Sequence, residues 1–272
     1  MSELEWKYQA LQDNLRALGR VAVAFSGGVD STLLLRVAHD TLGDKAIAIT
    51  AQSHTLPASE LGEATRFCAD NGISQIVVQV NELDIPGFRE NPPDRCYICK
   101  TGIFGEIIAE AKAQGITAVA EGSNVDDLDD YRPGRRAILE LGVKSPLLES
   151  GLSKQDVRAL SEQLGLPTWN KPSAACLASR FAYGELITDE GLAMVGAAEK
   201  FLREQGFAQS RVRIHGKLAR IEVAPECVPA LVTEPLRSDI IHRLKLLGFT
   251  YVTLDLAGYR MGSMNEALTA SS

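Results

Sequence analysis

Short apolar runs alternate with helical patterns over residues 20–170. The runs are VAVAF (21–25), KAIAIT (45–50), SQIVVQV (74–80) and ITAVAEG (116–122). Helical spacing lies near 31–42, 58–71, 97–114 and 153–165. Continuous apolar strands separated by helices are typical of a parallel sheet that is covered on both faces. The pattern predicts an α/β domain whose ligands bind beyond the carboxyl ends of the strands.

A different pattern follows residue 180. A helix at 189–205 precedes the alternating segment RVRIHGKLARIEVAP (211–225), a helix at 227–247 and a strand at 251–256. Alternation with period two indicates a strand or a hairpin, so this part has an α+β layout. We expect a nucleotide-binding domain over 1–178 and a smaller α+β domain over 179–272. The smaller domain is expected to bind substrate and to contribute to oligomer contacts.

The N-terminal segment predicts an amphipathic helix. Its apolar residues recur at three- or four-residue steps and are Leu4, Tyr8, Leu11, Leu15 and Leu18, with Gly19 able to end the helix. The acidic residues and the interrupted apolar face are unlike a signal peptide. No apolar run approaches the roughly 18–20 residues that span a bilayer. We therefore expect a cytoplasmic protein with no membrane partner.

Composition narrows the function classes. The 272 residues carry a net charge of −7, and 45% of them are hydrophobic. This acidic balance disfavours extended nucleic-acid binding, which needs a basic surface. The chain has five cysteines, an odd number that indicates metal binding or catalysis rather than a disulfide framework.

The segment VAVAFSGGVDSTLLLR (21–36) carries the main candidate chemistry. Two glycines between a strand and a helix let the backbone approach a phosphate, and the helix N-terminus offers unpaired N–H groups. Ser26 and Ser31 add hydroxyl donors, while Asp30 could hold Mg²⁺ against the phosphates. The alternative is a tight turn in which Asp30 or Ser31 caps the helix without any ligand.

Residues 26–31 resemble the SGGxDS motif of the PP-loop ATP pyrophosphatases. The resemblance assigns Ser26, Gly27, Gly28, Asp30 and Ser31 to ATP binding. It implies attack on the α-phosphate of ATP, release of pyrophosphate and an adenylated oxygen on the substrate. It also implies the adenine nucleotide α-hydrolase type of α/β fold.

Four further residues complete the expected nucleotide site. Thr50 follows the second strand, at the ligand-binding edge of the predicted sheet. EGSNVDD (121–127) resembles the GxNxDD-type segment of the same enzymes, which would place Asn124 and Asp127 near the nucleotide. Lys100 could neutralise pyrophosphate, although a solvated surface lysine is the simpler interpretation.

Three cysteines form the second candidate centre. Cys96 and Cys99 form a CxxC in RCYICK, and Cys176 stands in SAACLASR. A structural zinc site normally has a closed shell of four ligands, and no fourth ligand is visible. Three thiolates suit an iron–sulfur cluster with one open iron, which could accept a sulfide. The alternative gives the three cysteines independent roles, and Cys68 and Cys227 are interpreted as packing residues.

The segments WNKPSAACLASRFAYGE (169–185) and RVRIHGKLARIEV (211–223) resemble the LarE family. These sulfur transferases act in nickel-pincer nucleotide biosynthesis. The family activates a carboxylate of a pyridinium dicarboxylate mononucleotide with ATP and converts it to a thiocarboxylate. The resemblance makes Cys176 the sulfur-carrying residue, with Ser179 and Arg180 beside it. It also assigns Arg211 and Arg213 to the substrate phosphate.

The residues of the basic segment agree with that assignment. Alternate strand positions put Arg211, Arg213 and His215 on one face, opposite Val212 and Ile214. Guanidinium groups suit phosphate and carboxylate ligands. A solvated strand face is the alternative.

The resemblance also bears on the sulfur source. Sacrificial family members carry only the cysteine equivalent to Cys176, give up its sulfur and act once. This chain also has Cys96 and Cys99, as the cluster-bearing members do. We therefore expect a [4Fe-4S] cluster on Cys96, Cys99 and Cys176, supplied by sulfide or another sulfur donor, and repeated turnover. The family further implies a homo-oligomer.

Other functions remain open at this point. A cluster-dependent tRNA thiolase would need a basic groove or an added RNA-binding domain. An amidating PP-loop ligase would leave the cysteines without a role. A non-catalytic nucleotide-binding or cluster-binding module would bind ATP without releasing pyrophosphate.

Overall fold

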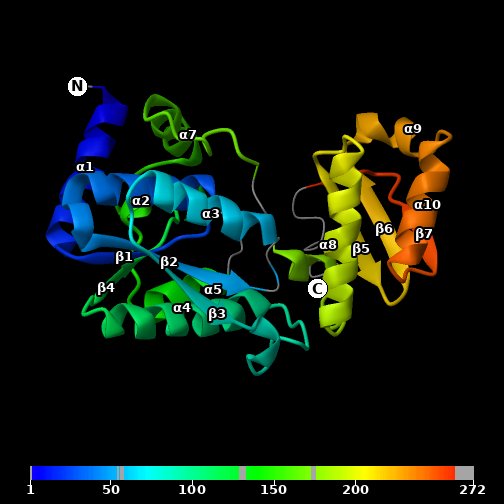
Figure 1. Ribbon diagram of the computed structural model, residues 1–272, viewed down its shortest axis with the longest axis horizontal. Helices are drawn as coiled ribbons and strands as arrows, with labels where there is room; N and C mark the ends of the chain where they lie inside the picture. The colour runs from blue at the N-terminus through cyan, green and yellow to red at the C-terminus, as the bar shows by residue number, and fades with distance from the viewer. Residues whose placement is uncertain (1, 54, 56–57, 129–132, 173–175, 261–272) are drawn as a thin grey trace. The chain divides into compact units, whose positions relative to one another are not determined.

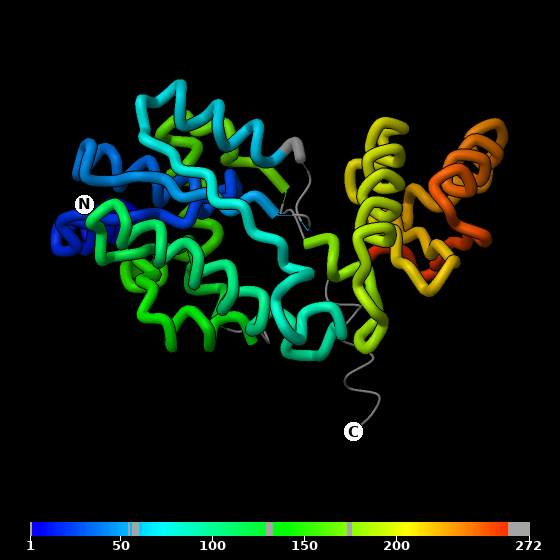
Figure 2. The backbone as a smooth tube through the Cα atoms, turned by 60° about the horizontal axis from the view of Figure 1, so that its bottom comes forward, coloured from blue at the N-terminus to red at the C-terminus, as the bar shows by residue number. Residues whose placement is uncertain are grey.

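A computed structural model of the chain describes residues 2–53, 55, 58–128, 133–172 and 176–260. The chain forms two compact units. The first consists of Met1–Ile85 and Asp94–Ala174, and the second of Pro86–Pro93 and Ala175–Ser272. Each unit has its own sheet (Figures 1 and 2). Within the described ranges, every helix is too short or too polar to cross a membrane.

The sheet of the first unit is entirely parallel, and it confirms the predicted α/β fold. Its strands lie in the order β3-β2-β1-β4. They are β1 (Val21–Ala24), β2 (Ala46–Ser53), β3 (Gln75–Val80) and β4 (Ala118–Ala120). Each coincides with one of the apolar runs. The central strand β1 is apolar at every position because helices cover both of its faces, whereas the edge strand β3 also carries Gln75 and Gln79.

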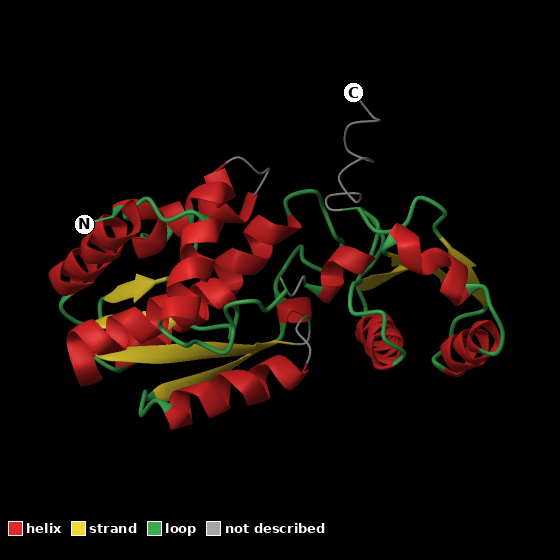
Figure 3. Cartoon of the chain, turned by 90° about the horizontal axis from the view of Figure 1, so that it is seen from above, coloured by secondary structure: helices red, strands yellow, loops and turns green. Residues whose placement is uncertain are grey.

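Helices cover both faces of this sheet (Figures 1 and 3). One face packs on α1 (Glu3–Leu18), α2 (Val29–Leu42), α3 (Ala58–Asp70) and α7 (Lys154–Gln163), and the other on α4 (Arg95–Ala113) and α5 (Pro133–Glu140). Val21 and Val23 of β1 point into the first layer and Ala22 into the second. This alternation follows from the two-residue period of a strand.

The N-terminal helix is confirmed as α1. Leu11 and Leu15 are fully buried, and Leu4, Tyr8 and Leu18 pack against the same core. Helix α6 (Pro146–Glu149) and α5 have no counterpart among the predicted helices. Short 3₁₀ turns complete the chain: η1 (Gly43–Lys45), η2 (Glu82–Asp84), η3 (Val125–Leu128), η4 (Leu177–Arg180) and η5 (Pro225–Cys227).

The second unit contains a three-stranded sheet in the order β5-β6-β7. Strands β5 (Ser210–His215) and β6 (Leu218–Val223) form an antiparallel hairpin, and β7 (Tyr251–Leu254) runs parallel to β6. Helices α8 (Asp189–Glu204) and α10 (Leu236–Leu246) lie side by side along the sheet (Figures 1 and 3). The alternating segment is therefore a hairpin, one of the two predicted outcomes.

The single helix predicted over 227–247 is wrong. The structure has α9 (Val228–Leu231), a break, and then α10, which begins after Pro235. A proline in a helix interior removes a backbone hydrogen bond and clashes with the preceding turn, so the helix cannot pass through that residue.

Candidate functional site

The loop between β1 and α2 has the geometry of an anion site. Gly28 is the N-cap of α2, and no side chain caps the helix. The capping alternative for Asp30 and Ser31 is therefore wrong, because both residues lie inside the first turn. A helix N-terminus without a side-chain cap leaves N–H groups available to an anion.

Hydroxyl groups close the loop on itself. The Oγ atoms of Ser26 and Ser31 lie 3.1 Å apart. The Gly28 N–H points at Ser26 Oγ over 3.4 Å, and Ser31 Oγ donates to the Gly28 carbonyl over 3.2 Å. The structure thus brings together Ser26, Gly28 and Ser31, three of the residues predicted at the ATP loop.

Two glycines are required by close packing around the loop. Gly27 has a φ of +73°, and a Cβ there would lie 3.3 Å from Cβ of Ala64 in α3. A Cβ on Gly122 would lie 3.0 Å from the Ser31 nitrogen. The loop is therefore held between α3 and the segment that follows β4.

Asp30 is already engaged by a cation and an amide. Lys154 Nζ lies 2.5 Å from Asp30 Oδ2, and Asn124 Nδ2 donates to Oδ1 over 3.1 Å. Asn124 therefore contacts the loop through Asp30, and its role toward a nucleotide stays a prediction. Asp127 instead accepts the Asn124 N–H over 2.9 Å and so fixes that segment. A carboxylate paired with lysine is suited to Mg²⁺ only if Lys154 moves aside, because the two cations compete for the same oxygens.

Thr50 and Lys100 have local partners. Thr50 is buried and accepts a hydrogen bond from Gln75 Nε2 over 2.8 Å. The stem of Lys100 packs on α5, where a Cβ on Gly134 would lie 2.8 Å from Lys100 Cδ. Their roles toward a nucleotide stay predictions.

Cys96 and Cys99 lie in the first turn of α4. Cys96 is exposed and Cys99 is partly exposed, and three-residue spacing places them on one face of the helix. Cys176 belongs to the second unit. Among the described residues, no group of three His, Cys, Asp or Glu side chains is arranged to hold a metal.

Cys68 has the properties of a packing residue. It is buried in the core of the first unit. Burial raises the pKa of the Cys68 thiol to about 11, so the thiol stays protonated at neutral pH.

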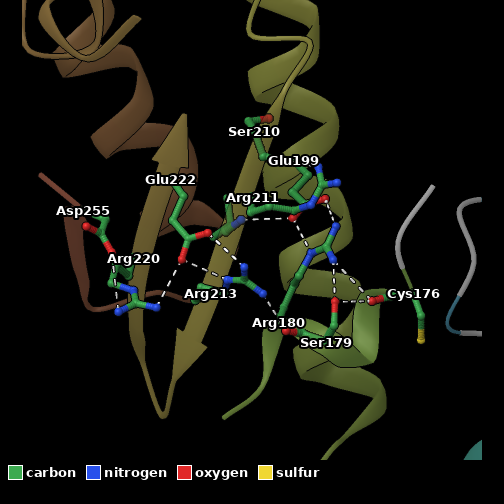
Figure 4. Close-up of polar contacts among 11 residues, drawn as sticks. Cys176, Ser179, Arg180, Glu199, Ser210, Arg211, Arg213, Arg220, Glu222 and Asp255 are labelled. Carbon is green, nitrogen blue, oxygen red and sulfur yellow. Dashed lines mark hydrogen bonds and ion pairs between the residues drawn. The ribbon is translucent and has the colours of Figure 1, made fainter. Parts of the chain in front are cut away.

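The backbone of Cys176 is anchored by its neighbours in η4 (Figure 4). Its carbonyl accepts from the Ser179 N–H over 3.0 Å, from Ser179 Oγ over 2.7 Å and from Arg180 Nη1 over 3.3 Å. Figure 4 shows the sulfur on the other side of the residue, pointing away from these contacts. Cys176, Ser179 and Arg180, which the resemblance assigns to the site, therefore form one hydrogen-bonded cluster.

Arg180 forms a buried bidentate ion pair with Glu199 of α8. Its Nε and Nη2 donate to the two carboxylate oxygens over 2.6 and 2.9 Å, and both side chains are 3% exposed. Glu199 Oε1 also accepts the Val212 N–H over 3.0 Å. Arg180 thereby connects η4 to α8 and to the edge of β5.

Arg213 forms a second bidentate pair, with Glu222 on β6. Its Nε and Nη2 donate over 3.0 and 2.9 Å, and its Nη1 donates to the Ser179 carbonyl over 2.7 Å. Arg220 also reaches Glu222 over 3.2 Å. Arg213 therefore holds the turn that carries Cys176 (Figure 4).

Arg211 differs from both of these arginines. Its guanidinium lies 5.1 Å from the ring centre of Tyr259, and Nη1 donates to the Ser210 carbonyl over 2.8 Å. Within the described ranges, no carboxylate forms an ion pair with it. Burial and then the nearby Arg180 lower the pKa of Arg211, although a guanidinium stays charged in proteins. Because Arg211 forms no ion pair within the described ranges, its guanidinium is suited to an incoming anion.

The sequence did not single out Glu199, Glu222, Lys154 or Lys171. Glu222 could have been found from the sequence, because a two-residue turn at Gly216 and Lys217 places it opposite Arg211 in the hairpin. The lysines and Glu199 meet their partners only through tertiary packing.

These pairings predict unequal stability losses. Arg213→Met should lower the free energy of unfolding by about 3 kcal/mol, because it leaves the buried Glu222 carboxylate without its bidentate partner. The matched change Arg211→Met should cost at most about 1 kcal/mol, because it breaks no ion pair. Urea denaturation of the two variants measures both values, and equal losses would contradict the distinction.

The comparisons with known proteins extend this picture. The asparagine synthase family model matches residues 8–106, which include the loop. An uncharacterised protein of Synechocystis is 46% identical over 98% of this chain and 99% of its own length. A pyridinium-3,5-bisthiocarboxylic acid mononucleotide synthase of Lactiplantibacillus plantarum is 39% identical over 99% of this chain and 97% of its own. The tRNA-specific 2-thiouridylase of Sinorhizobium medicae is 27% identical over 62% of the chain and 53% of its own length.

The parallel sheet, the uncapped loop at α2 and these relatives define an enzyme of the PP-loop class, an ATP-using sulfurtransferase. Within that class, the chain belongs to the LarE family, the sulfurtransferases of nickel-pincer cofactor biosynthesis. The resemblance inferred from the two sequence segments is thereby confirmed.

Proposed function

We propose that this enzyme uses ATP to adenylate a carboxylate of a pyridinium dicarboxylate mononucleotide and then replaces the AMP with sulfur. The product is a thiocarboxylate for nickel-pincer nucleotide biosynthesis. The match to the Lactiplantibacillus plantarum synthase over 99% of this chain carries the proposal, because it covers both units.

The first half-reaction belongs to the first unit. A substrate carboxylate oxygen attacks the α-phosphorus of ATP, the bond to the β,γ-pyrophosphate breaks, and an acyl adenylate forms. The N–H groups at the start of α2 and the hydroxyls of Ser26 and Ser31 bind the departing pyrophosphate. Asp30 would hold Mg²⁺ there once Lys154 releases the carboxylate, and the ion would neutralise phosphate charge.

The substrate is held by the arginines of the second unit. Arg211 receives the mononucleotide phosphate, because it forms no ion pair with a carboxylate within the described ranges. Arg213 and Arg180 also carry positive charge. Each is bound in an ion pair, so both serve mainly to position the residues around Ser179. Ser179 stands between them and next to Cys176.

The second half-reaction uses Cys176 together with Cys96 and Cys99. A sulfur nucleophile attacks the carbonyl carbon of the acyl adenylate, the bond to the AMP oxygen breaks, and the thiocarboxylate remains. A [4Fe-4S] cluster held by the three thiolates would supply this sulfur as a sulfide on its open iron. Cys96 and Cys99 fit such a cluster locally, because both are accessible on one face of α4. The proposal requires Cys176 to meet them.

The cluster predicts a defined iron content. Anaerobic reconstitution should give about four iron and four sulfide per chain, and Cys96→Ala should lower both markedly. The matched variant Cys68→Ala should keep them, because that thiol is buried in the core. Chemical iron and sulfide analysis measures the contents. A wild-type protein without iron after reconstitution would contradict the cluster and favour sacrificial donation from Cys176.

The match to a tRNA thiolase supports one alternative, cluster-dependent tRNA thiolation. The net charge of −7 opposes it, since tRNA binding needs a basic surface. Tight tRNA binding that weakens steeply with salt would favour this alternative. A homo-oligomer, proposed from the family resemblance, is tested by light scattering.

A further inference from the structure

Lys171 lies against the nucleotide loop from the segment that follows α7. Its Nζ is 3.2 Å from the Gly27 carbonyl oxygen, 2.6 Å from Glu60 Oε2 and 2.7 Å from Glu63 Oε2. The side chain is 18% exposed. An ammonium group has three donors, so these acceptors use all of them. Lys171 therefore has no donor left for a phosphate in this arrangement.

The segment that carries Lys171 is itself fixed. Arg158 of α7 donates to the Trp169 carbonyl over 2.6 Å and to the Lys171 carbonyl over 3.0 Å. Burial by itself lowers the pKa of Lys171, but hydrogen bonds to Glu60 and Glu63 outweigh it and raise the pKa overall. The ammonium thus stays charged and held at the Gly27 carbonyl.

This contact sets the orientation of one peptide group. In a trans peptide the C=O of one residue and the N–H of the next point in opposite directions. A hydrogen bond from Lys171 to the Gly27 carbonyl therefore directs the Gly28 N–H the other way, toward Ser26 Oγ and the loop interior. Gly27 and Gly28 carry no side chains that would resist rotation of this peptide, and the Gly28 N–H contact to Ser26 Oγ is long, at 3.4 Å.

We propose that Lys171 is a positioning residue that keeps the Gly28 N–H directed at the phosphates of ATP. Without it, the Gly27 carbonyl can turn into the loop, where an oxygen repels phosphate. The role rests on the proposed function of the loop, and it acts on phosphate binding rather than on the nucleoside.

Binding of ATP, inorganic pyrophosphate and adenosine by calorimetry tests this role. Lys171→Met should weaken the binding of both ATP and pyrophosphate by about tenfold or more, because a hydrogen bond to a charged group is lost. The affinity for adenosine should stay unchanged. Lys171→Arg should restore much of the affinity, because a guanidinium can donate to the same carbonyl. The control Lys200→Met removes an exposed lysine of α8 and should match the wild type.

A further variant separates positioning from direct attraction. Glu60→Gln combined with Glu63→Gln keeps the Lys171 charge but weakens the contacts that hold it. Positioning predicts weaker ATP binding, whereas direct attraction predicts tighter binding, since two negative charges are gone. The role of Lys171 would be overturned if the Glu60→Gln, Glu63→Gln variant bound ATP more tightly. It would also be overturned if Lys171→Met kept its affinity for ATP, or lost affinity for adenosine as strongly as for ATP. A wild-type protein that binds neither ATP nor pyrophosphate would instead overturn the proposed function of the loop, and the role of Lys171 with it.

Discussion

Replacing Cys176 with alanine is expected to abolish thiocarboxylate formation while pyrophosphate release continues. The structure explains why the two activities separate. Ser179 and Arg180 bind the main-chain carbonyl of Cys176, and alanine keeps that carbonyl. The substitution therefore removes the sulfur without removing the hydrogen bonds that hold η4.

The experiment compares Cys176→Ala with Cys227→Ala, a change of another partly exposed cysteine in the same unit. Pyrophosphate release is followed by a coupled assay and thiocarboxylate by mass spectrometry. Cys227→Ala should retain both activities. Thiocarboxylate formation by Cys176→Ala, or loss of pyrophosphate release from a folded variant, would contradict the assigned division of labour.

The second large effect is expected at Asp30. Asp30→Ala should reduce pyrophosphate release by about 100-fold or more, because it removes the proposed magnesium ligand next to the phosphates. It also leaves Lys154 and Asn124 without their shared partner. Sulfur transfer should fall by the same factor, since it needs the adenylate.

A matched control lies on the same helix. Asp40 of α2 pairs with Arg36 and is more exposed than Asp30, 34% against 24%, so Asp40→Ala tests the loss of a helix carboxylate away from the loop. It should release pyrophosphate at nearly the wild-type rate. If Asp30→Ala retained that rate with folding intact, Asp30 would not hold the metal.

Much of the first unit follows from the sequence. Strands β1 and β4 are apolar throughout, and β2 and β3 are mostly apolar, so the sequence identified all four as strands of one sheet. The loop at Ser26–Ser31 was equally clear, because Gly-Gly between a strand and a helix meets the backbone needs of a phosphate site. Helix α5 was missed because it is short, and Pro133 with Gly134 at its start are weak helix formers.

The contacts of the charged residues could not be predicted in the same way. Strand alternation placed Arg211 and Arg213 on one face, but it did not tell which of them a carboxylate neutralises. The hairpin register places Glu222 directly opposite Arg211, yet its carboxylate pairs with the diagonal neighbour Arg213, so only the packed side chains decide the pairing. Lys154 and Lys171 reach the loop across 124 and 144 residues of sequence, so only the packed fold brings them there.

The central claim is that ATP activates a pyridinium carboxylate for attack by sulfur. Its most direct test incubates the reconstituted protein anaerobically with ATP, Mg²⁺, sulfide and the pyridinium dicarboxylate mononucleotide, and follows products by mass spectrometry. The proposal predicts a product in which one carboxylate oxygen is replaced by sulfur, with one AMP and one pyrophosphate formed for each thiocarboxylate. An unaltered mononucleotide, in a preparation that binds ATP, would contradict it.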